Sequence, residues 1–428
     1  MHSDELHRAA SNDAYDIAVV GAGVVGVACA LALSRQGHRV LVLDRDEPGK
    51  GASFGNAGHL ATEQVFPIAD VSILKRLPAM LLDPMGPLRL DWRYLPRALP
   101  WFTRLLLNLR QRPYQNSVAA LRALNEASLD AWRRLLASVG HTQLLKEDGS
   151  LLVFERPESR AATAAVKQKM QAQGVPVEFW DAAAVQRTAP QLAESIQGGL
   201  FFPATGHFID PHLVVTTLVQ AARENGVRFA QEHVDSGQLV ADGVALRTGS
   251  GEVRARKVLI ACGAHSAKLT RQLTGKTVPL DTERGYHLML PHEHDRLPLA
   301  VTFMERRFIM TPMQGGLRLA GTVEFAGLER APNMQRAWQL HRLSQGLFKN
   351  ELNIEAASTW MGFRPSLPDS LPVIDQACDG RVLLAFGHQH LGLTQAATTA
   401  EMVASMAGAV SIEGKPLPAF APYRLDRF

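Results

Sequence analysis

Apolar runs and glycine-rich turns alternate at the start of the chain. A nearly continuous apolar run at 15–20 ends at glycine, which is the pattern of a strand buried in a parallel sheet. Residues 27–36 then predict a helix that stops at Gly37, and a second apolar run at 40–43 ends on Asp44. The sequence therefore predicts a strand–helix–strand unit at the beginning of the fold.

Later segments repeat this pattern and add a second one. Residues 257–266 predict a strand and turn, and 382–386 predict a strand followed by a flexible turn at 387–392 and a helix at 394–406. The remaining predictions are antiparallel strands at 282–290 and 307–311, a hairpin turn at 314–317, and amphipathic helices at 116–139 and 158–173.

Composition places the chain among folded proteins. It has 428 residues, of which 46% are hydrophobic and 20% charged, so disordered, collagen-like and coiled-coil classes are excluded. At roughly 150 residues per domain, two to three domains are expected. Its three cysteines (Cys29, Cys262 and Cys378) lie far apart, which favours neither a disulfide framework nor a zinc site and fits a reducing compartment. The histidine pairs at 292/294 and 388/390 lack an evident third ligand, so we expect no metal.

Charge is concentrated in one stretch. The net charge is only +4, but 71–112 holds eight Lys or Arg against two Asp, mixed with Trp92, Trp101 and Phe102. Two interpretations remain open: peripheral contact with an anionic membrane surface, where a quinone would be met, or an ordinary basic face packed on the domain. No basic tract resembles a nucleic-acid module, so no nucleic-acid partner is expected.

The uncharged run at 17–33 has the hydropathy of a short membrane span or signal segment. Three glycines in its first ten residues, and the acidic residues before it, argue against both. We therefore expect a cytoplasmic protein, with peripheral contact to the inner face of the cytoplasmic membrane as the extension that 71–112 allows.

The first turn carries a G-x-G-x-x-G fingerprint made of Gly21, Gly23 and Gly26. These glycines permit a tight turn, close approach of the backbone to a pyrophosphate, and close packing of helix on strand. The helix N-terminus supplies free N–H groups, and Asp44 can accept hydrogen bonds from an adenosine ribose. With its whole strand–helix–strand context, the fingerprint predicts dinucleotide binding. A loop of small residues at 49–58 follows Asp44 and suits an extended flavin dinucleotide better than NAD.

Five ordered blocks carry a resemblance that covers nearly the whole chain. They are the fingerprint, the loop with Gly51-Ala52-Ser53 and Asn56-Ala57-Gly58, the segments 206–211 and 257–266, and the C-terminal block 362–394 with its Gly362-Phe363-Arg364-Pro365 start. On these residues the chain resembles the D-amino-acid oxidase/dehydrogenase superfamily of FAD-dependent oxidoreductases, and within it the D-amino-acid dehydrogenase branch.

The resemblance implies an α/β fold, in which a Rossmann-like FAD-binding domain is joined to a discontinuous α+β substrate domain built on an antiparallel sheet. We expect FAD-binding segments at 14–70, 195–278 and 358–412, substrate-domain segments at 71–194 and 279–357, a flexible tail at 1–13 and a C-terminal tail at 413–428. The FAD should be non-covalent, since no cysteine occurs between Ser358 and Ala377. Expected FAD contacts are Gly21, Gly23, Val24, Val25, Gly26, Asp44, Arg45, Gly51, Ala52, Ser53, Asn56, Ala57, Gly58, His59, Val234, Ala261, Cys262, Gly263, Arg364, Gly387, His390, Leu391, Gly392, Leu393 and Thr394.

The same resemblance implies oxidation of an α-amino or α-imino acid, with hydride transfer from Cα to flavin N5. Arg364 matches the family's substrate-binding arginine, whose guanidinium can hold a carboxylate through two parallel bonds. Tyr286 would hydrogen-bond the same carboxylate. His59, His388 and His390 are candidates for direct roles beside the flavin, and weaker candidates are Glu63, Gln64 and Arg284.

The expected substrate is cis-4-hydroxy-D-proline or D-proline, and the expected acceptor is a quinone or another carrier. A general D-amino-acid dehydrogenase acting on D-alanine, and a sarcosine- or L-pipecolate-type oxidase, remain alternatives. Two other classes are an NAD-dependent dehydrogenase, which the C-terminal block disfavours, and a non-catalytic FAD-binding subunit of a complex, which Arg364 and Tyr286 disfavour.

Overall fold

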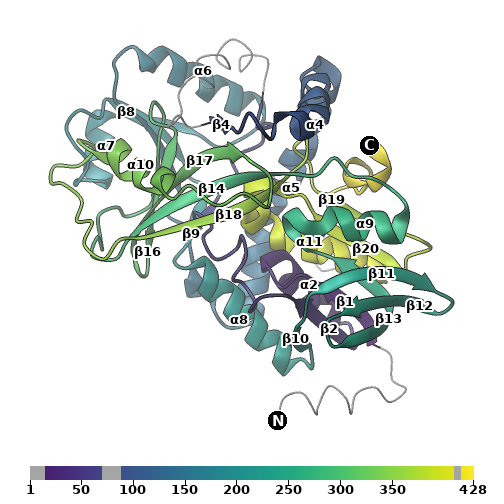
Figure 1. Cartoon of the computed structure of the whole chain (residues 1–428). Coiled ribbons are helices and arrows are strands. Elements are labelled where there is room, and N and C mark those ends of the chain that lie inside the picture. Colours follow the sequence, from purple (N-terminus) through teal and green to yellow (C-terminus); the bar gives the residue numbers. More distant parts are fainter. Residues whose placement is uncertain (1–14, 70–87, 409–415) are drawn as a thin grey trace.

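The computed structural model describes residues 15–69, 88–408 and 416–428. The predicted tail at 1–13, and the part of the basic stretch from 71 to 87, lie outside the described residues. Figure 1 shows two large sheets, one at the lower right around α2 and one at the upper left around β14 and β17.

The first sheet has a parallel centre in the order β10-β2-β1-β13-β20. Three further strands pair antiparallel at its margins. The strands are β1 (Tyr15–Val20), β2 (Val40–Asp44), β10 (Arg228–Gln231), β11 (Val234–Val240), β12 (Gly243–Thr248), β13 (Gly251–Ile260), β19 (Val373–Ala377) and β20 (Val382–Phe386).

Helices cover both faces of this sheet, which explains why its strands are apolar at every position of 17–20, 40–43, 258–260 and 382–386. In β1, Ile17 and Val19 face the core formed with α2 (Val24–Ser34), α8 (Pro211–Glu224), α11 (Gly392–Ala407) and α5 (Gln111–Ser138). Ala18 and Val20 face the other core, which includes α9 (Ser266–Thr274). The carboxyl ends of β1 and β2 are thereby held in fixed positions, where α/β sheets bind their ligands.

The second sheet is mainly antiparallel, in the order β18-β14-β17-β16-β15-β6-β8-β7, with β4 added beside β17. Its strands are β4 (Leu88–Leu90), β6 (Ser150–Phe154), β7 (Glu178–Asp181), β8 (Gly198–Phe202), β14 (Asp281–Leu290), β15 (Ala300–Phe303), β16 (Phe308–Met313), β17 (Gly316–Phe325) and β18 (Ser358–Ser366). A third, small sheet has the order β3-β9-β5 and consists of β3 (His59–Leu60), β5 (Leu145–Lys146) and β9 (Gly206–Phe208). The remaining helices are α4 (Leu95–Asn108), α6 (Ser159–Ala172), α7 (Ala182–Thr188), α10 (Gln335–Ser344) and the short 3₁₀ turns η1 (Thr142–Leu144), η2 (Gly263–His265), η3 (Gln389–Leu391), η4 (Ala421–Tyr423) and η5 (Leu425–Arg427).

The predicted elements are confirmed, including the first strand–helix–strand unit, the hairpin between β16 and β17, and the C-terminal strand, turn and helix. The α/β fold class with a mainly antiparallel second sheet is confirmed as well. The domain boundaries stay a prediction; β8 and β18, which fall within the proposed FAD-binding segments, pair in the second sheet. Over the described ranges, no helix is long and apolar enough to cross a membrane.

Candidate functional site

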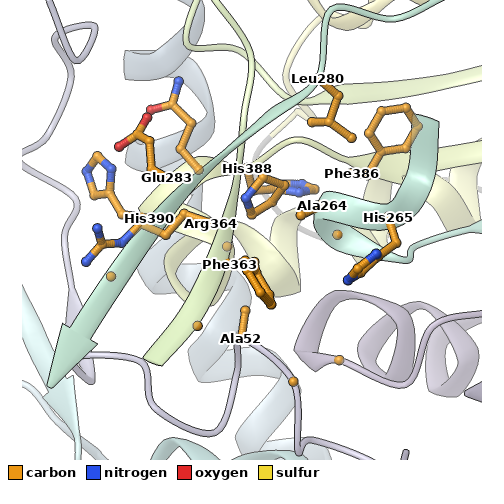
Figure 2. Close-up of a pocket in the computed structure, with 18 of the residues that line it drawn as sticks. Ala52, Ala264, His265, Leu280, Glu283, Phe363, Arg364, Phe386, His388 and His390 are labelled. Carbon is orange, nitrogen blue, oxygen red and sulfur yellow. The ribbon is translucent and has the colours of Figure 1, made fainter. Parts of the chain in front are cut away.

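One large cavity lies between the carboxyl ends of the parallel strands and the second sheet. Its volume is about 1400 Å³, above the range of roughly 300–1,000 Å³ usual for a small-molecule site. Figure 2 shows Glu283, Arg364 and His390 together on one side of it and His265 on the other. A cavity of this size has room for a dinucleotide and a small substrate.

The glycine turn at its base is shaped by contacts that leave no room for a side chain. Gly21 has a φ of +112°, and a Cβ there would overlap the carbonyl of Ala261. A Cβ on Gly26 would overlap the carbonyl of Gly21. The turn therefore brings α2 against β1 and leaves bare backbone facing the cavity.

The start of α2 presents free donors to the cavity. Ala22 N donates to Asp44 Oδ2 at 2.6 Å, and Val24 N donates to Ser53 Oγ at 2.9 Å. In the described part of the chain, no acceptor is recorded for the N–H groups of Gly23 and Val25, which border the cavity. An anion can take these donors at the positive end of the helix, and Asp44 keeps lone pairs for a ribose hydroxyl. The residues present therefore fit FAD.

The small-residue loop is fixed from the second sheet. Arg318 Nη1 donates to the Asn56 carbonyl at 2.6 Å, and His287 Nδ1 lies 3.0 Å from the Gly55 carbonyl. Burial and the Arg318 charge lower the pKa of His287 to about 4, so its ring is neutral and donates from Nδ1. The Trp360 indole stacks on His287 with ring centres 5.1 Å apart. These contacts hold the loop in the shape that lines the cavity.

Arg364 reaches the cavity by crossing a neighbouring strand. In the β14–β18 pairing, Arg364 lies opposite Glu283, and Gly362 lies opposite Gly285. The guanidinium lies over Gly285 and donates from Nη1 to the Thr322 carbonyl on β17 at 3.0 Å. Among the described residues no protein acceptor is recorded for Nε or Nη2 of Arg364, so these donors are available for a carboxylate.

His388 and His390 border the cavity as neutral side chains. His388 Nε2 lies 3.0 Å from Thr399 Oγ1, and burial lowers the pKa of His388 to about 3. His390 Nε2 donates to Gln64 Oε1 at 2.5 Å, and burial, with the charges of Arg364 and His59, lowers the pKa of His390 to about 3.

His59 differs from these two because both its ring nitrogens face acceptors. Nδ1 lies 3.1 Å from the Gly206 carbonyl and Nε2 lies 2.9 Å from Glu63 Oε1. Burial lowers the pKa of His59, but the charge and hydrogen bond of Glu63 and the bond to Gly206 outweigh it, so the pKa is raised. Both ring nitrogens of His59 are therefore engaged by the protein, and neither remains for a ligand.

The hydroxyl of Tyr286 already has two protein partners. Part of it borders the cavity, but its hydroxyl donates to Glu324 Oε2 at 2.6 Å and accepts from Asn333 N at 3.2 Å. Arg284 is fully buried and donates to backbone carbonyls of the 326–331 loop. Because side chains alternate along β14, both lie on the face opposite Glu283, and the expected contact of Tyr286 with a carboxylate on Arg364 stays a prediction.

Most of the expected FAD contacts border the cavity. They are Gly21, Gly23, Val24, Val25, Asp44, Arg45, Gly51, Ala52, Ser53, Asn56, Ala57, His59, Val234, Ala261, Cys262, Gly263, Arg364, His390, Gly392 and Leu393. Five others lie behind this surface and support it: Gly26, Gly58, Gly387, Leu391 and Thr394. Thr394, for example, accepts from Ala61 N at 3.0 Å and so ties the loop to α11. The individual contacts with FAD stay predictions.

Two features of the cavity were not predicted. The first is Glu283, a buried carboxyl group beside Arg364. The sequence feature that could have indicated it is a glutamate two residues before Gly285 in a predicted strand. The second is an apolar annex lined by Ile68, Leu95, Phe102, Leu105 and Phe325, where α4 packs on β17. No group of three or more His, Cys, Asp or Glu side chains suited to a metal ion occurs in the ranges that the structure covers.

Comparisons with known proteins agree with this geometry. A family model described as "FAD dependent oxidoreductase" matches residues 16–406. The chain is 34% identical over 420 residues to a D-amino-acid oxidase of Bradyrhizobium diazoefficiens, covering 95% of this chain and 98% of the relative. It is 32% identical over 406 residues to a D-amino acid dehydrogenase of a Methylobacterium strain, covering 91% and 94%. The solved glycine oxidase of Geobacillus kaustophilus shares the fold, with a TM-score of 0.75 at 22% identity, covering 97% of this chain and 100% of that one.

Proposed function

The chain belongs to the DAO family of FAD-dependent oxidoreductases, and we propose that it oxidises a small D-amino or D-imino acid whose carboxylate binds Arg364. Its cofactor is FAD, as the sequence predicted. Relatives named D-amino-acid oxidase and D-amino acid dehydrogenase support a CH–NH donor of D configuration. The observation that carries the proposal is the guanidinium of Arg364, which lies over Gly285 in the cavity wall and has donors without a protein acceptor among the described residues.

FAD supplies the two-electron acceptor for the hydride that leaves the substrate's α-carbon. Arg364 holds the carboxylate and thereby fixes the orientation of the α-carbon. The neutral rings of His388 and His390 form part of the wall and bring no second positive charge to the amine. His59 is held by Glu63 and by the Gly206 carbonyl and forms a fixed part of the cavity wall.

Within this class we propose a cyclic substrate, cis-4-hydroxy-D-proline or D-proline. The His390–Gln64 pair supports this choice because both polar side chains border the cavity and can meet a ring hydroxyl. D-Alanine is the second choice, and sarcosine or L-pipecolate is the third.

The substrate is tested by measuring kcat/KM with an artificial acceptor for cis-4-hydroxy-D-proline, D-proline, D-alanine, sarcosine and the L-isomers. The proposal predicts the highest kcat/KM for the cyclic D-acids. His390→Ala should lower kcat/KM for the hydroxylated ring more than for D-proline. Equal losses for both would contradict the role of the His390–Gln64 pair.

We propose a quinone-type acceptor that reaches the cavity through the apolar annex at α4. Leu99, Leu106 and Leu107 are each about half exposed on this helix. Five exposed arginines accompany them: Arg93, Arg97, Arg104, Arg110 and Arg112. Cations beside exposed apolar side chains suit an anionic membrane surface, while Trp101 and Ala98 pack inward. On this proposal, one side of α4 packs on the domain and its other side meets the membrane surface.

Vesicle binding tests this surface. Wild-type protein should sediment with vesicles containing anionic lipid, less at high salt, and little with neutral vesicles. Leu106→Ser combined with Leu107→Ser should weaken sedimentation, whereas Leu239→Ser, at an exposed leucine outside α4, should not. Sedimentation that is equal for both lipids and unaffected by the α4 changes would contradict the proposal.

A further inference from the structure

A buried carboxyl group faces the proposed carboxylate-binding arginine. Glu283 on β14 is the direct cross-strand neighbour of Arg364 on β18, and only 4% of it is exposed. Ser366 Oγ, two residues beyond Arg364, donates to Glu283 Oε1 at 2.5 Å. Glu283 also borders the cavity, as Figure 2 shows beside Arg364 and His390. A basic and an acidic side chain therefore lie next to each other on one wall.

This pair matches the charges of an amino acid in solution. The substrate carries a carboxylate and an ammonium group on one α-carbon, and the carboxylate takes the free donors of Arg364. Its ammonium then needs an acceptor nearby, because an unpaired charge in a buried site is strongly unfavourable. The α-amine must also be neutral before its lone pair can assist loss of the hydride, so one proton must leave it.

Resting on the proposed function, we infer that Glu283 binds the substrate's α-ammonium group and accepts its proton. The N–H bond of the ammonium breaks and an O–H bond forms on the Glu283 carboxylate, with no change in oxidation state. The neutral amine stays hydrogen-bonded to Glu283 while Arg364 holds the carboxylate. Glu283 is in this way a catalytic residue, since it touches the substrate at the nitrogen beside the reacting carbon.

The surroundings of Glu283 suit this role. Burial raises the pKa of Glu283, although the Ser366 hydrogen bond and the Arg364 charge oppose the rise and the Asp281 charge adds to it. A carboxylate of raised pKa is a better proton acceptor near neutral pH. Of the other groups around it, Asp281 accepts from Tyr94 at 2.8 Å, His388 and His390 are neutral, and His59 is paired with Glu63. None of these offers a second free carboxylate to the amine.

Glu283→Gln tests the inference, because glutamine keeps the size and can still accept from Ser366 but cannot take up a proton. With wild-type enzyme, kcat/KM should be level near neutral pH and fall in acid as Glu283 becomes protonated. The Glu283→Gln enzyme should oxidise only the small fraction of substrate molecules whose amine is already neutral in solution. Its kcat/KM should be lower by on the order of 1,000-fold at pH 7 and rise tenfold per pH unit until it approaches the wild-type value above the pKa of the substrate amine.

Two further variants separate proton transfer from a structural role. Glu283→Asp keeps a carboxylate and should recover part of the activity at pH 7. Ser366→Ala removes a hydrogen bond that lowers the pKa of Glu283, so its acid limb should move to higher pH. Glu178→Gln makes the same chemical change on the exposed strand β7 and should leave the profile unchanged.

A binding measurement adds a readout that does not depend on turnover. Calorimetry in buffers of different ionisation enthalpy, on enzyme whose flavin is chemically reduced, counts protons released when substrate binds. Wild-type enzyme should release none at pH 7, because the proton passes to Glu283, and Glu283→Gln should release about one. Pyrrole-2-carboxylate, which has no basic amine, should release none from either.

The outcomes distinguish the two proposals. If wild-type enzyme neither binds nor oxidises any D-amino acid, the proposed function fails. If it oxidises them but Glu283→Gln loses the same factor at every pH and releases no proton, Glu283 is only the counter-ion of Arg364 and the inference is overturned.

Discussion

Gly285→Ala tests the placement of Arg364 without changing any charge. The guanidinium crosses β14 directly above Gly285, where no side chain stands between it and the strand. A Cβ added there would lie 2.8 Å from Nη1 and closer still to Cζ and Nη2, whereas ordinary contacts begin at 3.4 Å. The guanidinium must therefore move by roughly 1 Å, away from the Thr322 carbonyl and from the position in which it holds a carboxylate.

The loss of substrate affinity follows from the hydrogen bonds that Arg364 would lose. A hydrogen bond to a charged group contributes about 1.5–3 kcal/mol, so losing the equivalent of one such bond weakens carboxylate binding by roughly 10- to 150-fold. A misplacement of ~1 Å can also lower the rate about 100-fold. We expect KM to rise within the first range and kcat to fall as well.

The assay measures KM and kcat for D-proline and the Kd of pyrrole-2-carboxylate, with flavin content as the check on folding. Gly315→Ala is the matched control. Gly315 lies in a turn and does not have a positive φ, and a Cβ added there would lie 3.4 Å from Met289 Cε, an ordinary contact. A folded, FAD-loaded Gly285→Ala enzyme with wild-type KM and Kd would refute the placement of the guanidinium over β14.

Two further predictions concern the cofactor and pH. Gly26→Ala forces a methyl group against the Gly21 carbonyl and should reduce the FAD retained on gel filtration, with affinity lowered roughly tenfold or more; full retention would contradict the role of this turn. The raised pKa of His59 means that its pair with Glu63 stabilises the fold below the ordinary histidine pKa of about 6.5, and that this stability is lost as pH rises through the raised value. Glu63→Gln should accordingly lower Tm more at pH 6 than at pH 9, and an equal shift at both would show that His59 is not protonated.

Local patterns allowed much of the fold to be predicted. The turn with Gly21 and the strand ending at Asp44 depend on residues close in sequence, so spacing alone predicted both. The C-terminal strand, turn and helix around His388 were predicted for the same reason.

The substrate wall was less predictable because it depends on strand register. Glu283 and Ser366 are 83 residues apart, and only the pairing of β14 with β18 brings them together. The same alternation turns Tyr286 to the opposite face, where Glu324 binds its hydroxyl, and a motif match alone does not show this contact. The apolar side of α4 was visible in the sequence, but its position beside the cavity was not.

The most direct test of the account is the visible spectrum of the purified protein under anaerobic conditions as D-proline and cis-4-hydroxy-D-proline are added. These acids should bleach the oxidised flavin band near ~450 nm, and Arg364→Leu enzyme, still yellow, should require far more of either acid. A yellow wild-type protein that no D-amino or D-imino acid bleaches would contradict the proposed reaction, and a protein unable to take up FAD would contradict its basis.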